Sequence, residues 1–250
     1  MKVSIITATY NSAATVSDTL LSVQKQTYPA IEHIIIDGLS NDNTLQIVSG
    51  FNHVQQVVSE KDDGIYDAMN KGIAYTTGDI IGILNSDDFY ADENIIEKVV
   101  QIFNTTKCDA VYGDLVFVDP VQTNKVSRKW IAGGYNEELF LKGWMPPHPT
   151  FFVRKEIYNQ FGQFNTTLKS SADYELMIRF LYLHKIKVKY LPATLVHMRS
   201  GGQSTKSVLN RLKANYEDYQ AWRLNSLKPK WYTLLLKPIR KIKQFYFSEF

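Results

Sequence analysis

The 250-residue sequence predicts an α/β protein with a mostly parallel sheet flanked by helices. In the first half, short β-branched apolar runs alternate with segments whose apolar residues recur at helical spacing, which is the pattern of βαβ units. Several runs are continuously apolar, as expected for strands covered on both faces. A hydrophobic content of 44% is sufficient for one large domain, or for a domain with an appendage.

Four strands and four helices are predicted before residue 109. The strands are β-branched or continuously apolar runs, namely Val3–Thr7, Ile31–Asp37, Val54–Ser59 and Ile80–Leu84. The helices follow from apolar spacing and from cap-type residues such as Ser40 to Asp42, and they are Ala13–Gln26, Asn43–Ser49, Ile65–Tyr75 and Ile95–Phe103. This alternation predicts a parallel sheet.

The pattern becomes less regular after Asp109, which predicts a smaller second region. Its expected strands are Val111–Val118, Lys125–Trp130, Phe151–Arg154 and Val188–Leu191. Its expected helices are Lys155–Phe161, Asp173–Lys185 and Leu209–Leu224, and Gly133–Pro149 is expected to be a loop.

Polar clusters follow the four strands of the first half, namely Ala8–Asn11, Asp37–Gly38, Glu60–Gly64 and Asn85–Asp88. Ligands of open α/β sheets bind at the carboxyl ends of the strands, so we expect these clusters to meet in one site. Asp87 and Asp88 are adjacent carboxylates at the mouth of an apolar strand, and a divalent cation would offset their repulsion. The alternative is a solvated turn that caps the helix beginning near Glu93.

Charge and cysteine content exclude other classes. Residues 228–250 carry six basic residues and one acid, a net charge of +5, which leaves −2 for residues 1–227. The body is therefore not expected to bind nucleic acid. The single cysteine, Cys108, excludes an internal disulfide and fits a reducing compartment, and no leader peptide or membrane-spanning run is expected.

Five segments occur in an order and at spacings that together are specific: Ser4–Asn11, Asp37, Asp63–Gly72, Gly78–Asp79 and Leu84–Asp88. Over roughly residues 1–205 the chain resembles family 2 glycosyltransferases of the GT-A fold, which are inverting enzymes that use nucleotide-diphosphate sugars. The resemblance implies a domain over residues 1–205, with a nucleotide-binding half (1–108) and an acceptor-binding half (109–205). Residues 206–250 are expected to form a helical, basic and aromatic extension.

The resemblance also implies roles for individual residues. Nucleotide or donor contacts are expected from the backbone at Ala8 and from Tyr10, Asp37, Asp63 and Asp87. Asp88 would bind Mn²⁺ or Mg²⁺. Asp173, in the acidic motif Ala172–Glu175, would be the catalytic base, with Glu175 as the alternative base and a helix N-cap as the alternative role. Position 8 is Ala where many members have Pro, so the first loop is expected to be less rigid.

Four further residues are candidates from their chemistry. Trp144 and His148 suit a sugar-binding rim on the acceptor side, although a proline-rich loop can simply be a rigid connection. His197 could be a third metal ligand or a structural residue, and Arg199 could bind the diphosphate. A loop carrying Gly201 and Gly202 could exclude water from the site.

The expected activity is transfer of one hexosyl or N-acetylhexosaminyl group to a hydroxyl of a glycan or lipid-linked acceptor, in bacterial surface polysaccharide synthesis. The Gln-x-x-Arg-Trp motif of processive synthases is missing. The alternatives are a non-catalytic binder of nucleotide sugars and a sugar nucleotidyltransferase, although the latter calls for a glycine-rich loop after the first strand. A dinucleotide oxidoreductase is excluded because no two glycines have G-x-G spacing.

The basic and aromatic segment from Lys228 to Phe247 suits contact with an anionic membrane. The alternative is a helix that packs on the body or on a second copy of the chain, which would form a homodimer. The expected location is the cytoplasm or the inner face of the cytoplasmic membrane.

Overall fold

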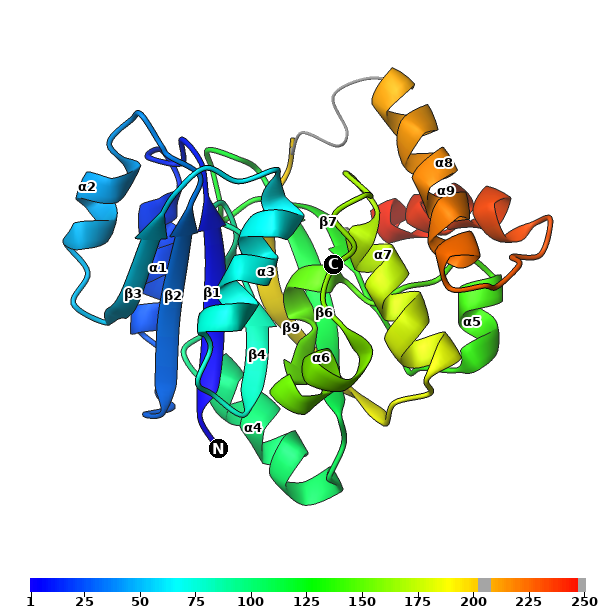
Figure 1. The fold of residues 1–250 in the computed structure, drawn as a ribbon, viewed down its shortest axis with the longest axis horizontal. Coiled ribbons are helices and arrows are strands. Elements are labelled where there is room, and N and C mark those ends of the chain that lie inside the picture. Colours follow the sequence, from blue (N-terminus) through cyan, green and yellow to red (C-terminus); the bar gives the residue numbers. More distant parts are fainter. Residues whose placement is uncertain (202–207, 247–250) are drawn as a thin grey trace.

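A computed structural model describes residues 1–201 and 208–246. Its strands lie in one sheet, in the order β3-β2-β1-β4-β8-β6-β9-β5, with β7 paired to β6 (Figure 1). The strands are β1 (Val3–Thr9), β2 (Ile31–Asp37), β3 (Val54–Ser59), β4 (Ile80–Ile83), β5 (Phe89–Tyr90), β6 (Ala110–Val118), β7 (Val126–Trp130), β8 (Phe152–Arg154) and β9 (Val188–Arg199). The predicted α/β class is confirmed.

Helices lie on both faces of this sheet (Figure 1). They are α1 (Val16–Gln24), α2 (Thr44–Ser49), α3 (Ile65–Tyr75), α4 (Ile95–Thr106), α5 (Glu137–Leu141), α6 (Lys155–Phe161), α7 (Ala172–Met177), α8 (Val208–Leu224) and α9 (Thr233–Tyr246). A short 3-10 helix, η1 (His148–Thr150), and a π-helix, η2 (Ile178–Leu183), complete the set. Asp173–Lys185 is thus two segments, α7 and η2, where the sequence predicted one helix.

Strands β3, β2, β1 and β4 are parallel, so their carboxyl ends share one edge of the sheet. Strand β8 is antiparallel to both β4 and β6, and β6 therefore runs in the same direction as β4. This edge holds the loops that follow β1, β2, β3 and β4. The convergence predicted from the four polar clusters is confirmed by the topology.

The core has a separate cluster of buried side chains on each face of the sheet. Ile6, Ile34 and Ile81 pack on one face with Met69 of α3. Val3, Ile5 and Ile80 pack on the other face with residues of α4. Successive side chains of a strand point to opposite faces, so the continuous apolar runs of β1 and β4 supply both clusters.

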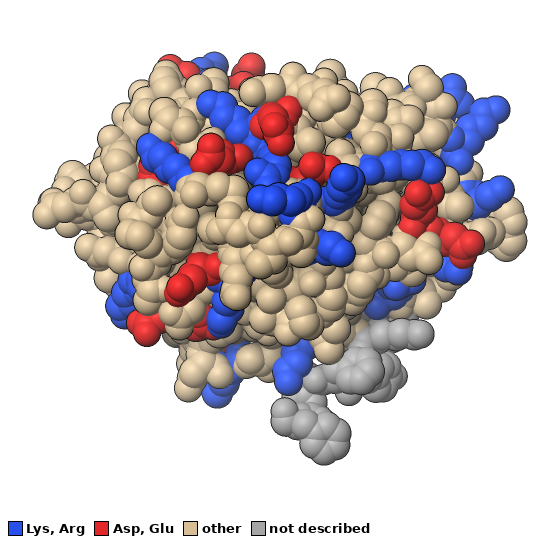
Figure 2. Space-filling view, turned by 90° about the horizontal axis from the view of Figure 1, so that it is seen from below, with Lys and Arg blue, Asp and Glu red and all other residues tan. Residues whose placement is uncertain are grey.

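The two predicted halves share this one sheet. Strand β5, from the first half, pairs with β9, from the second, and β4 pairs with β8. On the face shown in Figure 2, Lys and Arg side chains form a band with Asp and Glu side chains close beside it. The interspersed signs agree with the small net charge of residues 1–227.

Candidate functional site

The acidic loop after β4 is held in place by hydroxyl groups of α1 and the residues before it. Thr19 donates to the Asp88 carbonyl (2.7 Å), Thr15 donates to the Ser86 carbonyl (2.9 Å), and the Ser12 hydroxyl lies 2.8 Å from that of Ser86. The hydroxyl contacts fix the backbone from Ser86 to Asp88, so the carboxylates of this loop are presented in one arrangement.

Asp88 is fully buried, and only one of its carboxylate oxygens is satisfied. Asn85 Nδ2 donates to Oδ2 (2.8 Å), whereas the buried Oδ1 has no hydrogen-bond partner. Burial, followed by the charge of Asp87, raises the pKa of Asp88 well above its usual value. An unpaired buried carboxylate is costly, and a bound cation would remove that cost. The residues present therefore fit a divalent metal held through Asp88.

Within residues 1–201 and 208–246, no group of three His, Cys, Asp or Glu side chains could hold a metal. A cation at Asp88 would thus need oxygen ligands from a bound molecule, as Mg²⁺ often takes from phosphates. His197 does not join Asp88: it pairs with Phe89 across β5 and β9, and its ring contacts the Phe89 ring at 5.2 Å. Adjacent strand positions face opposite sides, which separates His197 from Asp88.

Arg199 holds the acidic loop through a hydrogen bond to its backbone. Its guanidinium donates to the Asp87 carbonyl (2.7 Å) and the Pro120 carbonyl (3.3 Å), and it pairs with the Asp18 carboxylate of α1. Only 6% of the residue is exposed. The expected contact to a diphosphate is not supported by this position, because the three guanidinium nitrogens bond protein acceptors.

The first loop and the end of β2 lie side by side, since the Gly38 amide donates to the Thr9 carbonyl. Tyr10, in the first loop, is 62% exposed, so its ring is accessible to a ligand. Ala8, on β1, is half-buried and packs against the core. A Cβ at Gly38 would collide with the carboxylate of Asp62 and would lie 3.5 Å from the Tyr10 ring. Glycine at position 38 therefore brings Asp62 and Tyr10 together over the end of the sheet.

Asp37 ties three strand ends together and has no exposed surface. Thr9 donates to Oδ1 (2.9 Å), Ser59 donates to Oδ2 (2.8 Å), and Ser40 donates to both oxygens. A direct hydrogen bond from Asp37 to a ligand would require one of these donors to move.

Asp62, which sequence reasoning did not single out, lies near the end of β2, because its carboxylate is next to Gly38. Asp62 accepts from the Gly64 amide (3.0 Å) and lies against Gly38. Asp63 is exposed, and its amide donates to Asp67 at the start of α3 (3.1 Å). The sequence feature that could have indicated Asp62 is the pair of adjacent carboxylates, Asp62 and Asp63, just before Gly64. Gly64 has a positive φ of 117° and turns the chain into α3.

A second cluster brings together four residues that are distant in sequence. The Tyr66 hydroxyl of α3 donates to Asp173 Oδ1 of α7 (3.0 Å), and the Tyr66 ring stacks on Phe164 at 5.6 Å. The His148 ring meets Phe164 edge to face at 5.5 Å, and the charge of Asp173 opposes the lowering of the His148 pKa by burial. His148 begins η1, which packs against β4, the strand that leads into the loop with Asp87 and Asp88.

The Tyr66 phenol stays protonated. Burial, followed by the charge of Asp173, raises its pKa well above the usual value. Tyr66 is therefore a fixed donor to Asp173. Asp173 does not cap α7, because no side chain makes a capping hydrogen bond at the start of this helix.

Two predicted site residues are core residues instead. Glu175 is 3% exposed, and its oxygens accept from Arg179 (2.9 Å) and Asn225 (3.0 Å), so it is unsuited to be the base. Trp144 is 4% exposed, its indole donates to the Ala132 carbonyl (2.8 Å), and its ring contacts Phe140. The expectation that Trp144 lines the acceptor side is wrong because the ring is buried in the core.

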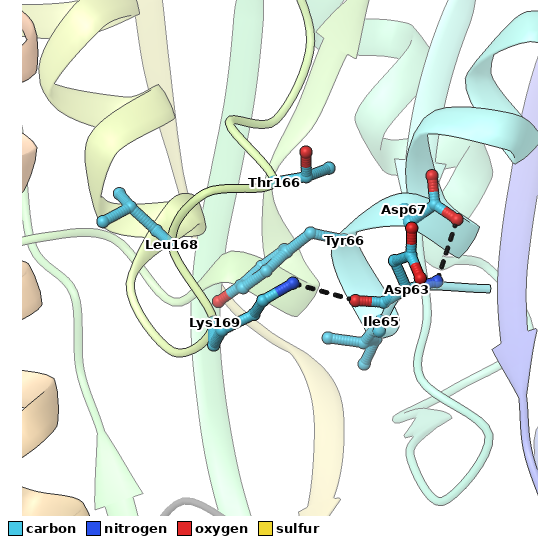
Figure 3. A pocket seen from close by; sticks show the side chains of 8 residues that line it. Asp63, Ile65, Tyr66, Asp67, Thr166, Leu168 and Lys169 are labelled. Carbon is cyan, nitrogen blue, oxygen red and sulfur yellow. Dashed lines mark hydrogen bonds between the residues drawn. The ribbon is translucent and has the colours of Figure 1, made fainter.

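The segment before α7 closes a small pocket over α3 (Figure 3). Lys169 Nζ donates to the Asp63 carbonyl (3.0 Å), and Leu168 and Tyr66 line the same pocket. Glu217 of α8 accepts from the Ser170 (2.7 Å) and Ser171 (3.1 Å) amides. The expected water-excluding loop at Gly201 and Gly202 lies outside the described residues from Gly202 onward.

Residues 4–171 match the family model described as Glycosyl transferase family 2. A PGL/p-HBAD biosynthesis glycosyltransferase of Mycobacterium tuberculosis is 25% identical over 213 residues, covering 83% of this chain and 80% of the relative. An uncharacterized glycosyltransferase of the same organism is 31% identical over 189 residues, covering 71% of this chain and 68% of the relative.

Two solved structures share the fold. S. aureus TarS 1-349 in complex with UDP-GlcNAc has a TM-score of 0.71 at 21% identity, and the match covers 90% of this chain and 65% of that one. The mannosyltransferase PcManGT from Pyrobaculum calidifontis, in complex with GDP-Man and Mn²⁺, has a TM-score of 0.66 at 16% identity, with coverage of 90% and 64%. This chain thus spans just under two thirds of each structural relative.

Proposed function

Since the chain belongs to glycosyl transferase family 2, we propose that it moves a single sugar, with inversion, from a nucleotide-diphosphate sugar to an acceptor hydroxyl. The main support for this proposal is the buried Oδ1 of Asp88, which has no hydrogen-bond partner and lies just after the carboxyl end of β4. Open α/β sheets bind ligands at this position. A cation bound to the unpaired oxygen would offset the cost of burying it. The structures of relatives with UDP-GlcNAc and with GDP-Man and Mn²⁺ support this proposal.

We assign Asp88 to hold Mn²⁺ or Mg²⁺, with phosphate oxygens of the donor as the remaining ligands. When bound, the metal supplies positive charge for the departing diphosphate. Asp87, which is half-exposed beside it, is assigned to the ribose or the donor sugar. Because Arg199 and His197 face protein groups, neither is included in this assignment.

The exposed Tyr10 ring is assigned to stack on the nucleobase of the donor, next to the loop that begins at Ala8. Asp62 is proposed for the contact to base or ribose that the sequence assigned to Asp63, because it lies against Gly38 and Tyr10. A contact between Asp37 and the nucleobase, through a carboxylate oxygen that also accepts from Thr9, stays a prediction.

Asp173 is assigned as the general base that takes the proton from the acceptor hydroxyl. Tyr66 holds Oδ1 of this carboxylate, so we assign the proton transfer to Oδ2. His148, beside Phe164, is placed to contact the acceptor or the donor sugar. The proposed donor group is a hexose or N-acetylhexosamine, and the proposed acceptor is a glycan or a lipid-linked glycan.

Calorimetry with UDP and GDP, with and without Mn²⁺, tests the metal assignment. We expect one nucleotide to bind at least about tenfold more tightly with Mn²⁺, and Asp88→Asn to abolish that difference. Equal affinity with and without the metal would overturn the role of Asp88.

A screen of nucleotide sugars for slow donor hydrolysis separates an enzyme from a non-catalytic binder. A binder would show metal-dependent nucleotide binding and no hydrolysis of any donor. Asp173→Asn is expected to lower transfer by about a hundredfold or more while nucleotide affinity is retained. Transfer that survives in Asp173→Asn would show that another residue is the base.

A further inference from the structure

Helix α9 is fixed against the acceptor-binding half along one side. Thr233 donates to the Leu141 carbonyl (2.7 Å). Lys237 donates to Asp218 (2.6 Å), and its ammonium lies 3.6 Å from the centre of the Tyr174 ring. Gly143, at φ +73°, lets the helix come close, because a Cβ there would lie 2.5 Å from the Lys237 backbone nitrogen. These contacts set the rotation of α9 about its own axis.

That rotation leaves an apolar stripe on the outer side. Trp231, in the turn before α9, is 84% exposed, Leu235 is 59% exposed and Ile239 is 51% exposed. These three residues, called the α9 stripe below, are spaced by four. At about 100° per residue, Leu235 points about 200° away from Thr233, so the helical part of the stripe, Leu235 and Ile239, faces away from the bound side.

The surroundings of the α9 stripe are basic. Lys228 and Lys230 are exposed just before Trp231, and Arg240 is half-exposed on the helix. The segment 228–250 carries +5, against −2 for residues 1–227. None of the described helices is long and apolar enough to cross a membrane. A basic helix with an exposed apolar stripe and an aromatic residue at one end is suited to lie in the headgroup region of an anionic bilayer.

We propose that the α9 stripe docks on an anionic membrane surface, with Lys228 and Lys230 directed at the lipid phosphates. The bound side of α9 contacts Tyr174, the neighbour of Asp173, so docking brings the acceptor-binding half to the membrane. The base would then face a lipid-linked acceptor. That last consequence rests on the proposed function, whereas membrane binding itself does not.

Vesicle flotation of the full chain tests the docking. We expect binding to vesicles that contain phosphatidylglycerol and weak binding to pure phosphatidylcholine. Replacing the α9 stripe by serine (Trp231→Ser, Leu235→Ser, Ile239→Ser) should lower the partition coefficient at least about tenfold. Replacing Lys228 and Lys230 by glutamine should lower it about fivefold per lysine, on anionic vesicles alone.

The matched control is Val121→Ser, which removes an equally exposed apolar side chain (86%) from the turn between β6 and β7. It should leave flotation unchanged, and the melting temperature should confirm that every variant folds. The tryptophan emission should shift to the blue on anionic vesicles, and the serine variant, which lacks Trp231, should show no such shift.

Three outcomes would overturn the proposal. One is the absence of flotation with any lipid mixture, and another is flotation that the serine variant retains. The third is a dimer in light scattering that the serine variant converts to monomer, which would show that the stripe docks on a second copy. Flotation requires no donor, so failure of the glycosyltransferase assignment would be seen separately in the nucleotide experiments.

Discussion

The buried acidic residues of the candidate site are of two kinds, which differ in their hydrogen-bond partners. Asp88 is buried with a free oxygen, whereas Asp37 is buried with both oxygens satisfied by Thr9, Ser40 and Ser59. The sequence indicated both positions, because both follow an apolar strand. Only the hydrogen-bond partners, which come from other loops, distinguish a side chain that needs a ligand from one that organises the backbone.

Tyr66→Phe is expected to lower kcat about tenfold without changing nucleotide affinity, because Asp173 loses a donor that fixes its orientation. Tyr75→Phe, on the same helix but 43% exposed, is the matched control and should behave as wild type. Steady-state kinetics and calorimetry measure the two quantities. An unchanged kcat in Tyr66→Phe would show that this hydroxyl does not position the base.

The contribution of His33 to stability is expected to fall as the pH falls below about 6.5. Buried His33 lies between Thr7 and His53, and burial lowers its pKa from 6.5 to about 3. The unfolded chain therefore binds this proton first, and the contribution of His33 to the free energy of unfolding decreases by up to about 1.4 kcal/mol per pH unit in this window. Urea unfolding at about pH 7.5 and 5.5 measures it.

His33→Gln should reduce that pH dependence, since it removes the titrating ring. Glu32 does not interfere, because its pKa is lowered from 4.5 to about 2 and its contribution is lost only at more acidic pH. A wild-type slope that persists unchanged in His33→Gln would contradict the assignment.

Secondary-structure elements were predictable where the pattern was local. The runs that form β1 to β4 are apolar enough to identify without any neighbours. Strand β9 continues past Pro192 to Arg199, although the sequence predicted an end at Leu191, because pairing with β6 sustains it. The two residues of β5 form a strand only through β9, so no local pattern could indicate them.

Tertiary contacts also explain the two misassigned site residues. Glu175 pairs with Arg179 one turn later and with Asn225 of the tail, which is remote in sequence. The Trp144 indole finds a carbonyl acceptor at Ala132, and this satisfied donor lets the ring enter the core. In the sequence, an aromatic residue beside prolines suggests the rim of a sugar-binding site. Whether its ring is buried depends on a hydrogen-bond acceptor that the local sequence does not reveal.

Gly143→Ala is expected to displace α9 and to lower the melting temperature by several degrees, because the added methyl group would meet the helix backbone and the backbone has positive φ. Gly134→Ala is the control, since nothing lies within 4 Å of a Cβ there. Differential scanning calorimetry and limited proteolysis between α8 and α9 check the result. Equal melting temperatures for the two variants would contradict it.

At the scale of the whole molecule, we expect the two halves to unfold as one unit. The sheet runs through both, and Asn70 exchanges two hydrogen bonds with the Phe164 backbone, each 2.9 Å long. The predicted division at residue 108 into a nucleotide-binding and an acceptor-binding half therefore crosses one continuous sheet. That division stays a prediction.

Urea unfolding is expected to be a single transition with the same midpoint by two probes. All four tryptophans (Trp130, Trp144, Trp222 and Trp231) lie in the second half and the tail, so fluorescence reports on those regions. Far-ultraviolet circular dichroism reports on the whole chain. Separate midpoints would show that the halves unfold independently.

The hydrogen bonds from the Ser170 and Ser171 amides to Glu217 have a consequence for engineering. The family match ends at Ser171, yet the peptide just ahead of Asp173 is shaped by a carboxylate 46 positions further along. A chimera that joins the first part of this chain to the tail of a relative would keep these two hydrogen bonds only if that tail supplies an acceptor at the position of Glu217. Recombination between such enzymes should therefore transfer both segments together.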